Sequence, residues 1–189
     1  MKLGARCSDC PLNGQVPVLS EGPLGAKLAC IGEAPGRDEV KANRPFIGRS
    51  GEELDKYLLQ VGTARPAVVL GNAVACFPPG GDWKTFLTLA KKKWKEEHGT
   101  GKKAKPFQNP IDCCRPRLFE ELRVDKCKLC GKYLGLRHIP LVTCSCSKPL
   151  RVSRNGSTIV VPMGNAAMES LLGFDGITKW RGSCLKAER

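Results

Sequence analysis

Three short apolar runs, each followed by glycine or by proline and glycine, constrain the fold of this chain most. They cover Leu28 to Ile31, Ala67 to Leu70 and Thr158 to Val161. Runs of this length without polar alternation are typical of strands buried on both faces of a parallel sheet. Helical patterns follow at Ser50 to Leu59 and at Asn165 to Leu172. This alternation predicts an α/β fold with a central parallel sheet.

The first helical pattern has recognisable ends and one apolar face. Ser50 is its expected N-cap, with Glu53 three residues later, and Leu54, Leu58 and Val61 are expected to face the core.

One main domain fits a chain of 189 residues. With 41% hydrophobic and 26% charged residues, the composition excludes wholesale disorder, a collagen-like repeat and a coiled-coil rod. No apolar run reaches the roughly 18 residues of a membrane span, and the segment from Met1 to Gly14 lacks the apolar stretch of a signal peptide. We therefore expect a cytoplasmic, intracellular protein.

The charge is strongly basic. The 31 Lys and Arg residues against 18 Asp and Glu give a net charge of +13, which favours a polyanionic partner such as DNA. Eight lysines and two glutamates between Lys84 and Lys105 supply six of these charges. Phe86, Ala90 and Trp94 keep an apolar face there, which predicts a basic amphipathic helix. Contact with the DNA backbone and a merely solvated face are both open; the DNA-binding candidates are Lys91, Lys92, Lys93, Lys95, Lys102, Lys103 and Arg181.

Eleven cysteines in a chain of this kind indicate metal binding rather than disulfides, because the cytosol keeps thiols reduced. Two close pairs of cysteines, with thirteen residues between the pairs, predict a tetrahedral zinc site. Its ligands are Cys127, Cys130, Cys144 and Cys146. His138 as a substitute ligand, an iron–sulfur cluster and free thiols are the alternatives there. Another pair, Cys7 and Cys10, needs partners elsewhere, and its candidates are Cys76, Cys113 and Cys114.

Short motifs run through the chain in a consistent order. They are Cys7-x2-Cys10-Pro11-Leu12, Gly32-Glu33-Ala34-Pro35-Gly36, Arg44-Pro45-Phe46-Ile47-Gly48, Asn72-Ala73-Val74-x-Cys76-x-Pro78-Pro79, Cys114-Arg115-Pro116, Gly164-Asn165-Ala166 and Gly176-Ile177-Thr178-Lys179-Trp180-Arg181-Gly182. Together they resemble the iron–sulfur uracil-DNA glycosylases, family 4 of that superfamily. The resemblance covers most of residues 1–80, 113–122 and 157–182. It implies a three-layer α/β/α fold and removal of uracil from single- or double-stranded DNA in repair or replication.

The resemblance also implies roles for individual residues. Glu33 and Ala34, with Gly32, Pro35 and Gly36, match the motif that positions the hydrolytic water. Phe46 matches the ring that stacks on the flipped base, and Asn72 matches the amide that reads uracil. Glu39 matches the side chain that fills the space of a thymine methyl group. The implied ligands of a [4Fe–4S] cluster are Cys7, Cys10, Cys76 and Cys114, with Cys113 competing for the last place.

The order of the strands supports this placement independently of the resemblance. Glu33 to Gly36 and Asn72 each follow a predicted strand directly. They should therefore meet at the carboxyl edge of the sheet, where ligands of α/β proteins usually bind.

The matching segments divide the chain into expected parts. These are the first part of the core with the cysteine knuckle (1–83), a basic insertion (84–112), a return to the cluster and core (113–124), a zinc-knuckle insertion (125–156) and the last strand and helix of the core (157–189).

The sequence departs from the family at its end. Members carry a His-Pro-Ser loop whose histidine stabilises charge on the departing uracil, whereas the only histidines here are His98 and His138. Three interpretations are open. The chain is the leading piece of a longer protein, as in glycosylase-like domains fused to phage DNA polymerases; it is completed by a second chain; or it is a catalytically inactive DNA-binding and docking module. We expect a uracil-DNA glycosylase, with the inactive module as the alternative.

Overall fold

A parallel three-stranded sheet forms the centre of the molecule in a computed structural model that describes residues 3–23, 25–100, 104–122, 159–173 and 176. The strands are β1 (Leu28–Gly32), β2 (Val69–Asn72) and β3 (Ile159–Pro162), in the order β2-β1-β3. In the register of β1 and β2, Gly32 lies opposite Asn72. The predicted parallel α/β sheet is confirmed, and its central strand is the first in the chain.

The second strand begins two residues later than the sequence predicted. Residues Arg65–Ala67 form a 3-10 turn, η2, because Pro66 fixes a backbone angle that suits a turn and cannot donate to the ladder. The strand also ends later, because Asn72 pairs with Gly32 of β1; Asn72 is therefore the last residue of β2 rather than the first residue of the following loop.

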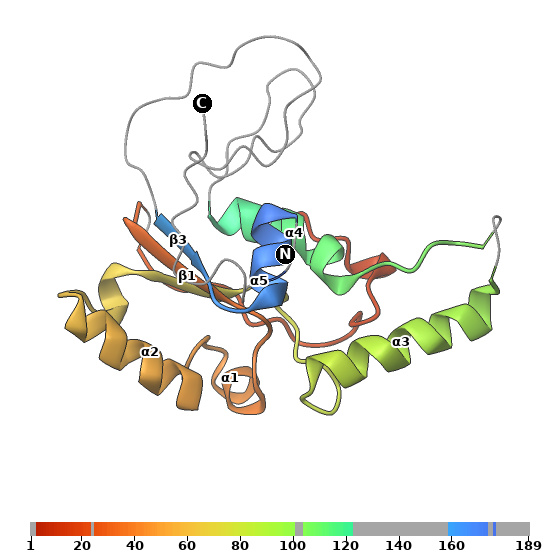
Figure 1. The fold of residues 1–189 in the computed structure, drawn as a ribbon, viewed down its shortest axis with the longest axis horizontal. Helices are drawn as coiled ribbons and strands as arrows, with labels where there is room; N and C mark the ends of the chain where they lie inside the picture. Colours follow the sequence, from red (N-terminus) through yellow and green to blue (C-terminus); the bar gives the residue numbers. More distant parts are fainter. Residues whose placement is uncertain (1–2, 24, 101–103, 123–158, 174–175, 177–189) are drawn as a thin grey trace, which may run out of the picture.

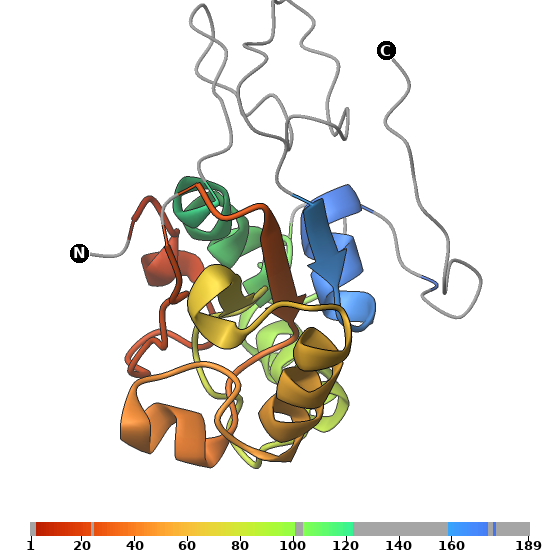
Figure 2. The ribbon, with the colours of Figure 1, turned by 90° about the vertical axis from the view of Figure 1, so that its left-hand side faces the viewer.

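Helices cover both faces of the sheet (Figures 1 and 2). On one face, α2 (Arg49–Gln60) places Leu54 and Leu58 against Cys30 and Leu70. On the other face, α4 (Pro110–Glu121) and α5 (Asn165–Leu172) form a second core, whose buried members are Ile31, Leu118, Phe119, Ala167 and Leu171. This arrangement confirms the three-layer α/β/α fold.

Two details of α2 differ from the prediction. Gly48, not Ser50, is the N-cap, because the Gly48 carbonyl accepts hydrogen bonds from the N–H groups of Gly51 (2.8 Å) and Glu52 (3.1 Å). Val61 lies just beyond the end of the helix and is 72% exposed, so it does not join the apolar face.

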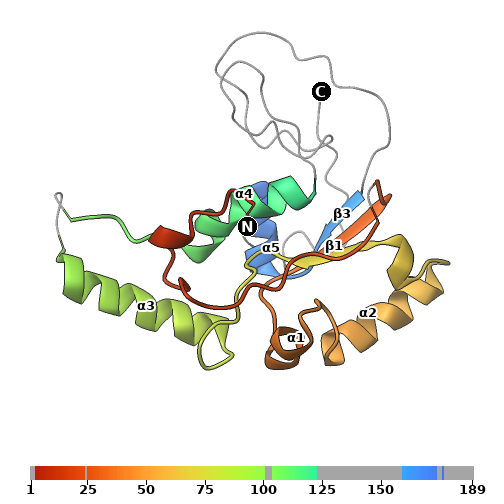
Figure 3. The ribbon, with the colours of Figure 1, turned by 180° about the vertical axis from the view of Figure 1, so that it is seen from behind.

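The N-terminal segment contains η1 (Cys7–Asp9) and runs along the edge of the sheet beside α4 (Figure 3). Glu21 and Leu70 exchange backbone hydrogen bonds of 2.9 and 2.8 Å, so this segment covers the outer edge of β2. The Arg6 N–H donates to the Cys113 carbonyl at 3.0 Å, which attaches the segment to α4.

Helix α3 (Trp83–His98) extends away from the sheet (Figures 1 and 3). Its first turn is anchored by Trp83 and Phe86, which are buried in a third core with Val74 and Ile111. The second half is mostly exposed and carries the lysines, so the predicted basic amphipathic helix is confirmed. None of the helices in the described ranges is long and apolar enough to cross a membrane.

Candidate functional site

Three predicted site residues meet where β1 and β2 end. A Cβ atom at Gly32 would lie 2.5 Å from Asn72 Oδ1 and 2.8 Å from Phe46 Cζ, so only glycine lets the amide and the ring approach this closely. Asn72 is 3% exposed, and its Nδ2 atom has no hydrogen-bond partner among the described residues. A buried amide N–H without an acceptor is costly, and a bound ligand that carries an acceptor would satisfy it.

The Phe46 ring is buried, and its carbonyl is held from two sides. Its φ angle is +56°, which is uncommon for a residue other than glycine. The Arg65 guanidinium donates to the Phe46 carbonyl at 2.5 Å, and Gly51 of α2 lies against the same carbonyl with no room for a side chain. Sequence reasoning missed Arg65, because its partners are distant in the chain and no local pattern marks it.

Glu39 lies on α1 (Arg37–Ala42) and connects the two loops of the site. One of its carboxylate oxygens accepts the Gly36 N–H and the other accepts the Phe46 N–H. The carboxylate therefore holds the Gly32–Gly36 turn against the Phe46 loop. Its expected role in excluding a thymine methyl group stays a prediction.

Glu33 follows β1 and is half-buried. Burial raises the pKa of its carboxyl above the ordinary value; the Asp82 carboxylate at the start of α3 adds to this, and Lys84 opposes it. Its backbone carbonyl accepts the Val74 N–H at 3.0 Å, so the loops after β1 and β2 remain bonded beyond the sheet. The neighbouring Pro35 is buried, and Ala34 packs on the core around Val74.

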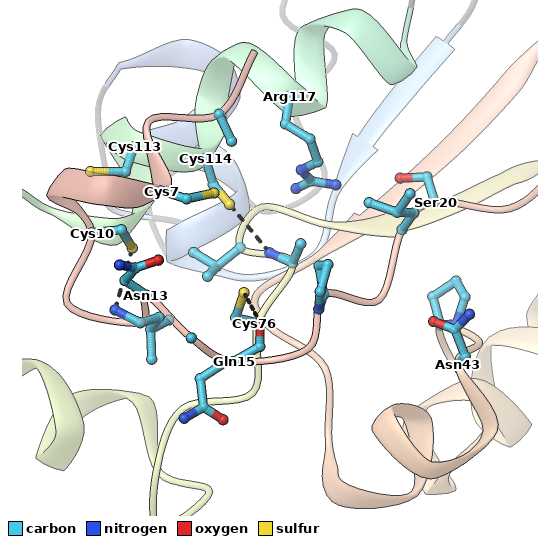
Figure 4. Close-up of a pocket in the computed structure, with 18 of the residues that line it drawn as sticks. Cys7, Cys10, Asn13, Gln15, Ser20, Asn43, Cys76, Cys113, Cys114 and Arg117 are labelled. Atoms are coloured by element: carbon cyan, nitrogen blue, oxygen red, sulfur yellow. Dashed lines mark hydrogen bonds between the residues drawn. The ribbon is translucent and has the colours of Figure 1, made fainter. Parts of the chain in front are cut away.

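A second feature is a cavity of about 550 Å³ beside this edge of the sheet (Figure 4). Five cysteines from three separate segments line it: Cys7, Cys10, Cys76, Cys113 and Cys114. Figure 4 shows the cysteines on one side, with Ser20 and Asn43 on the other. The structure thus brings the Cys7–Cys10 pair together with all three of its predicted partners.

The thiols differ in their contacts. Cys114 Sγ accepts the Ala75 N–H at 3.5 Å, and Cys10 Sγ accepts the Leu12 N–H at 3.4 Å. Burial raises the pKa of Cys10 to about 12, with smaller contributions from the nearby thiols. Burial raises the pKa of Cys113, and its side chain leaves α4 in a different direction from that of Cys114 (Figure 4).

The donor set of this cavity suits an iron–sulfur cluster, which takes four thiolates and is tuned by N–H groups bonded to sulfur. In the described part of the chain, no three His, Cys, Asp or Glu side chains are already arranged around a common metal position. The cavity therefore supplies the ligand type and the space, and the thiols would turn toward a bound group.

The remaining predicted residues fall into two sets. Lys91, Lys92, Lys93 and Lys95 lie exposed along the second half of α3; Lys93 pairs with Glu97 at 3.8 Å, and Lys91 lies over the Phe107 ring. Outside the described residues lie Lys102, Lys103, Arg181 and the predicted zinc ligands Cys127, Cys130, Cys144 and Cys146.

Comparison with known proteins gives one family. The profile of the Uracil DNA glycosylase superfamily matches residues 19–145, which is more than half of the chain. That range contains the Gly32, Phe46 and Asn72 cluster and three of the five cavity cysteines.

Curated relatives match over a shorter stretch. A Type-4 uracil-DNA glycosylase of Thermotoga maritima is 41% identical over 76 residues, which is 39% of this chain and 40% of the relative. The protein of the same name from Pyrobaculum aerophilum is 39% identical over 75 residues, or 39% and 38% of the two chains. A third, from Archaeoglobus fulgidus, is 41% identical over 54 residues, or 29% and 27%. The matching region thus spans about two fifths or less of the length of these relatives.

Proposed function

Because this chain belongs to the uracil-DNA glycosylase superfamily, we propose that it recognises uracil in DNA and hydrolyses the bond between the base and the sugar. The observation that carries the proposal is the buried, unpartnered Nδ2 of Asn72 beside the Phe46 ring. An aromatic face and an amide aimed at the Watson–Crick edge are what a flipped base requires. The amide would donate to uracil O4 and accept from N3–H.

The other residues of this cluster would position the Phe46 loop and the attacking water molecule. Glu39 and Arg65 hold the Phe46 loop in place before the base arrives. Glu33, as a carboxylate, would orient a water molecule toward C1′ of the sugar. The water oxygen bonds to C1′ as the bond from C1′ to N1 breaks, and the water proton ends on the released uracil. Pre-organised groups of this kind lower the barrier without reorganising during the reaction.

We further propose that Cys7, Cys10, Cys76 and Cys114 hold a [4Fe–4S] cluster in the cavity. When bound, the cluster would supply a covalent connection between segments rather than redox chemistry. It would join the N-terminal segment, the loop after β2 and α4, which the protein alone connects through hydrogen bonds and through the core that Leu12, Val74 and Ile111 share. Zinc at the second cysteine set, between residues 127 and 146, is a proposal from the sequence.

The lysines of α3 are proposed to contact the DNA backbone. The first turn of α3 is anchored in the core, and Lys84 in that turn lies near Glu33. The row of lysines along α3 therefore begins next to the site. Phosphate contacts of this type position a nucleic acid without reading its sequence.

The decisive experiment measures release of free uracil from a uracil-containing oligonucleotide by anaerobically purified protein. We expect release by the wild type, and loss of release with Asn72→Ala and with Asn72→Asp, which keeps the shape but removes the N–H donor. Both variants should bind uracil-free DNA as the wild type does. Equal loss of DNA binding and release would make Asn72 a structural residue.

A second outcome favours the inactive docking module. If the wild type releases no uracil but binds the same DNA tightly, then the matching segment serves DNA attachment, and the proposed activity is wrong for this chain.

A further inference from the structure

A buried arginine lies between the cysteine cavity and the strand end that carries Asn72. Arg117, on α4, is 1% exposed, and its guanidinium points toward the end of β2 (Figure 4). Its Nη2 donates to the Asn72 carbonyl at 2.6 Å and to the Ala73 carbonyl at 3.1 Å. One planar group therefore fixes two successive carbonyls at the strand end.

The charge of this arginine is balanced from its own helix. Arg117 Nη1 pairs with Glu121 Oε2 at 2.6 Å, and the Glu121 side chain is only 7% exposed. The same oxygen accepts the Ser20 hydroxyl at 2.5 Å, which brings in the N-terminal segment. A buried ion is costly unless it is paired and hydrogen-bonded, so Glu121 is what allows Arg117 to stay buried.

Helix α4 contacts the end of β2 and the loop that follows it at two points one turn apart. Arg117 holds Asn72 and Ala73, and Cys114 accepts the Ala75 N–H at 3.5 Å. The helix that lines the cysteine cavity thus also fixes the backbone that presents the Asn72 amide. The Asn72 Nδ2 has no partner of its own in the described structure, so the backbone and the Gly32 contact decide where it points.

We infer that Arg117 is a positioning residue for Asn72 and joins the cysteine cavity to uracil recognition. The part of this inference that concerns uracil rests on the proposed function; the anchoring of the strand end does not. Displacing a recognition group by about 1 Å can cost about 100-fold in rate, so a missing anchor should be visible in the reaction itself.

The test uses a charge-balanced pair of substitutions. Arg117→Met alone leaves the Glu121 carboxylate buried without a positive charge beside it and can unfold the protein. Arg117→Met with Glu121→Gln removes both charges and keeps the side-chain volumes similar. The matched control is Arg115→Met with Asp112→Asn, which removes an ion pair of the same helix. Arg115 donates to the Ser170 and Glu169 carbonyls of α5, at 2.8 and 3.1 Å, and not to β2.

Two measurements compare the wild type with both double variants, after the iron content of each protein has been checked. The first is the single-turnover rate of uracil release at saturating protein, together with the affinity for uracil-free DNA. For the Arg117 pair we expect the rate to fall about 10- to 100-fold with DNA affinity unchanged, and for the Arg115 pair we expect wild-type behaviour. The second is hydrogen exchange at the Ala73 and Val74 amides, which should accelerate only in the Arg117 pair.

The inference is overturned if the folded Arg117 double variant keeps the wild-type rate of uracil release and the wild-type amide exchange. It is also overturned if the rate of the Arg115 double variant falls as far as that of the Arg117 double variant. Should the wild type release no uracil, the proposed function fails by itself. Hydrogen exchange then still decides the anchoring: acceleration confined to the Arg117 pair supports it, and unchanged protection rejects it.

Discussion

Glu33 shows how one residue's surroundings set the conditions for the proposed chemistry. Burial raises the pKa of its carboxyl, and the Asp82 carboxylate raises it further, while Lys84 lowers it. Orienting water requires the ionised form, so activity is lost as the pH falls through this raised pKa. The acid limb of the activity profile should therefore lie above the ordinary carboxyl value.

The contribution of Asp82 to this limb can be tested by itself. Asp82→Asn removes the charge but can still accept the Thr85 N–H (2.6 Å) that caps α3. We expect the acid limb of kcat/KM against pH to move to lower pH. Lys84→Gln should move it to higher pH, because it removes the opposing charge. A limb that responds to neither substitution would belong to another group.

At the scale of single elements, α4 separates the two neighbouring cysteines. Cys114 faces the loop after β2 through the Ala75 N–H, whereas the side chain of Cys113 leaves the helix in another direction (Figure 4) and the Cys113 carbonyl accepts the Arg6 N–H. We expect Cys114→Ser to lose most bound iron and sulfide, and Cys113→Ser to retain it. Iron and sulfide analysis of the anaerobically purified variants measures this. The reverse result would make Cys113 the fourth ligand.

The lysines of α3 lead to a separate prediction, which concerns the salt dependence of DNA affinity. Lys92→Gln with Lys95→Gln should reduce the slope of log affinity for DNA against log salt by up to about 0.9 for each phosphate that a lysine no longer neutralises. The control, Lys41→Gln with Lys56→Gln, removes the same charge from α1 and α2, where both lysines already pair with carboxylates. Equal changes in the two pairs would mean that only net charge matters and that α3 does not bind phosphates specifically.

At the scale of the whole molecule, Glu21 joins three segments that are distant in sequence. It contacts Arg44 before the Phe46 loop (2.9 Å) and Arg65 in η2 (3.2 Å), and its backbone pairs with β2. Burial alone would raise the pKa of Glu21, but the hydrogen bonds from the two arginines outweigh it and hold the pKa below its ordinary value.

The stability that Glu21 contributes should depend on pH. A lowered folded-state pKa stabilises the protein above the unfolded-state value, and this is lost as the pH falls through the folded value. Glu21→Gln should lower the free energy of unfolding at neutral pH by under about 1 kcal/mol, because its partners remain partly in water. Denaturant unfolding at several pH values should show the difference shrinking in acid. A difference that persists in acid would come from packing instead.

Much of this fold could be predicted because the signals are local. Apolar runs located the three strands to within about two residues, and spacing identified α2 and α3. Helix α4 was not predicted, because Pro110 and Pro116 interrupt the helical pattern of the sequence. Pro110 is nevertheless favourable for the helix, since it occupies the first turn. The shift of β2 escaped prediction because the edge of a strand depends on its partners, here β1 and the segment around Glu21.

The sequence by itself determined the alternation of strands and helices, the basic face and the residue types of the candidate site. Periodicity, charge and the order of motifs are properties of the sequence and need no tertiary contacts. Only the tertiary structure decided that Asn72 ends a strand against Gly32, that five cysteines line one cavity, and that Arg117 fixes the strand end. The physical reason is that each depends on contacts across tens of residues: Arg117 lies 45 positions from Asn72. A buried arginine is tolerable only where folding supplies carbonyls and a carboxylate for it.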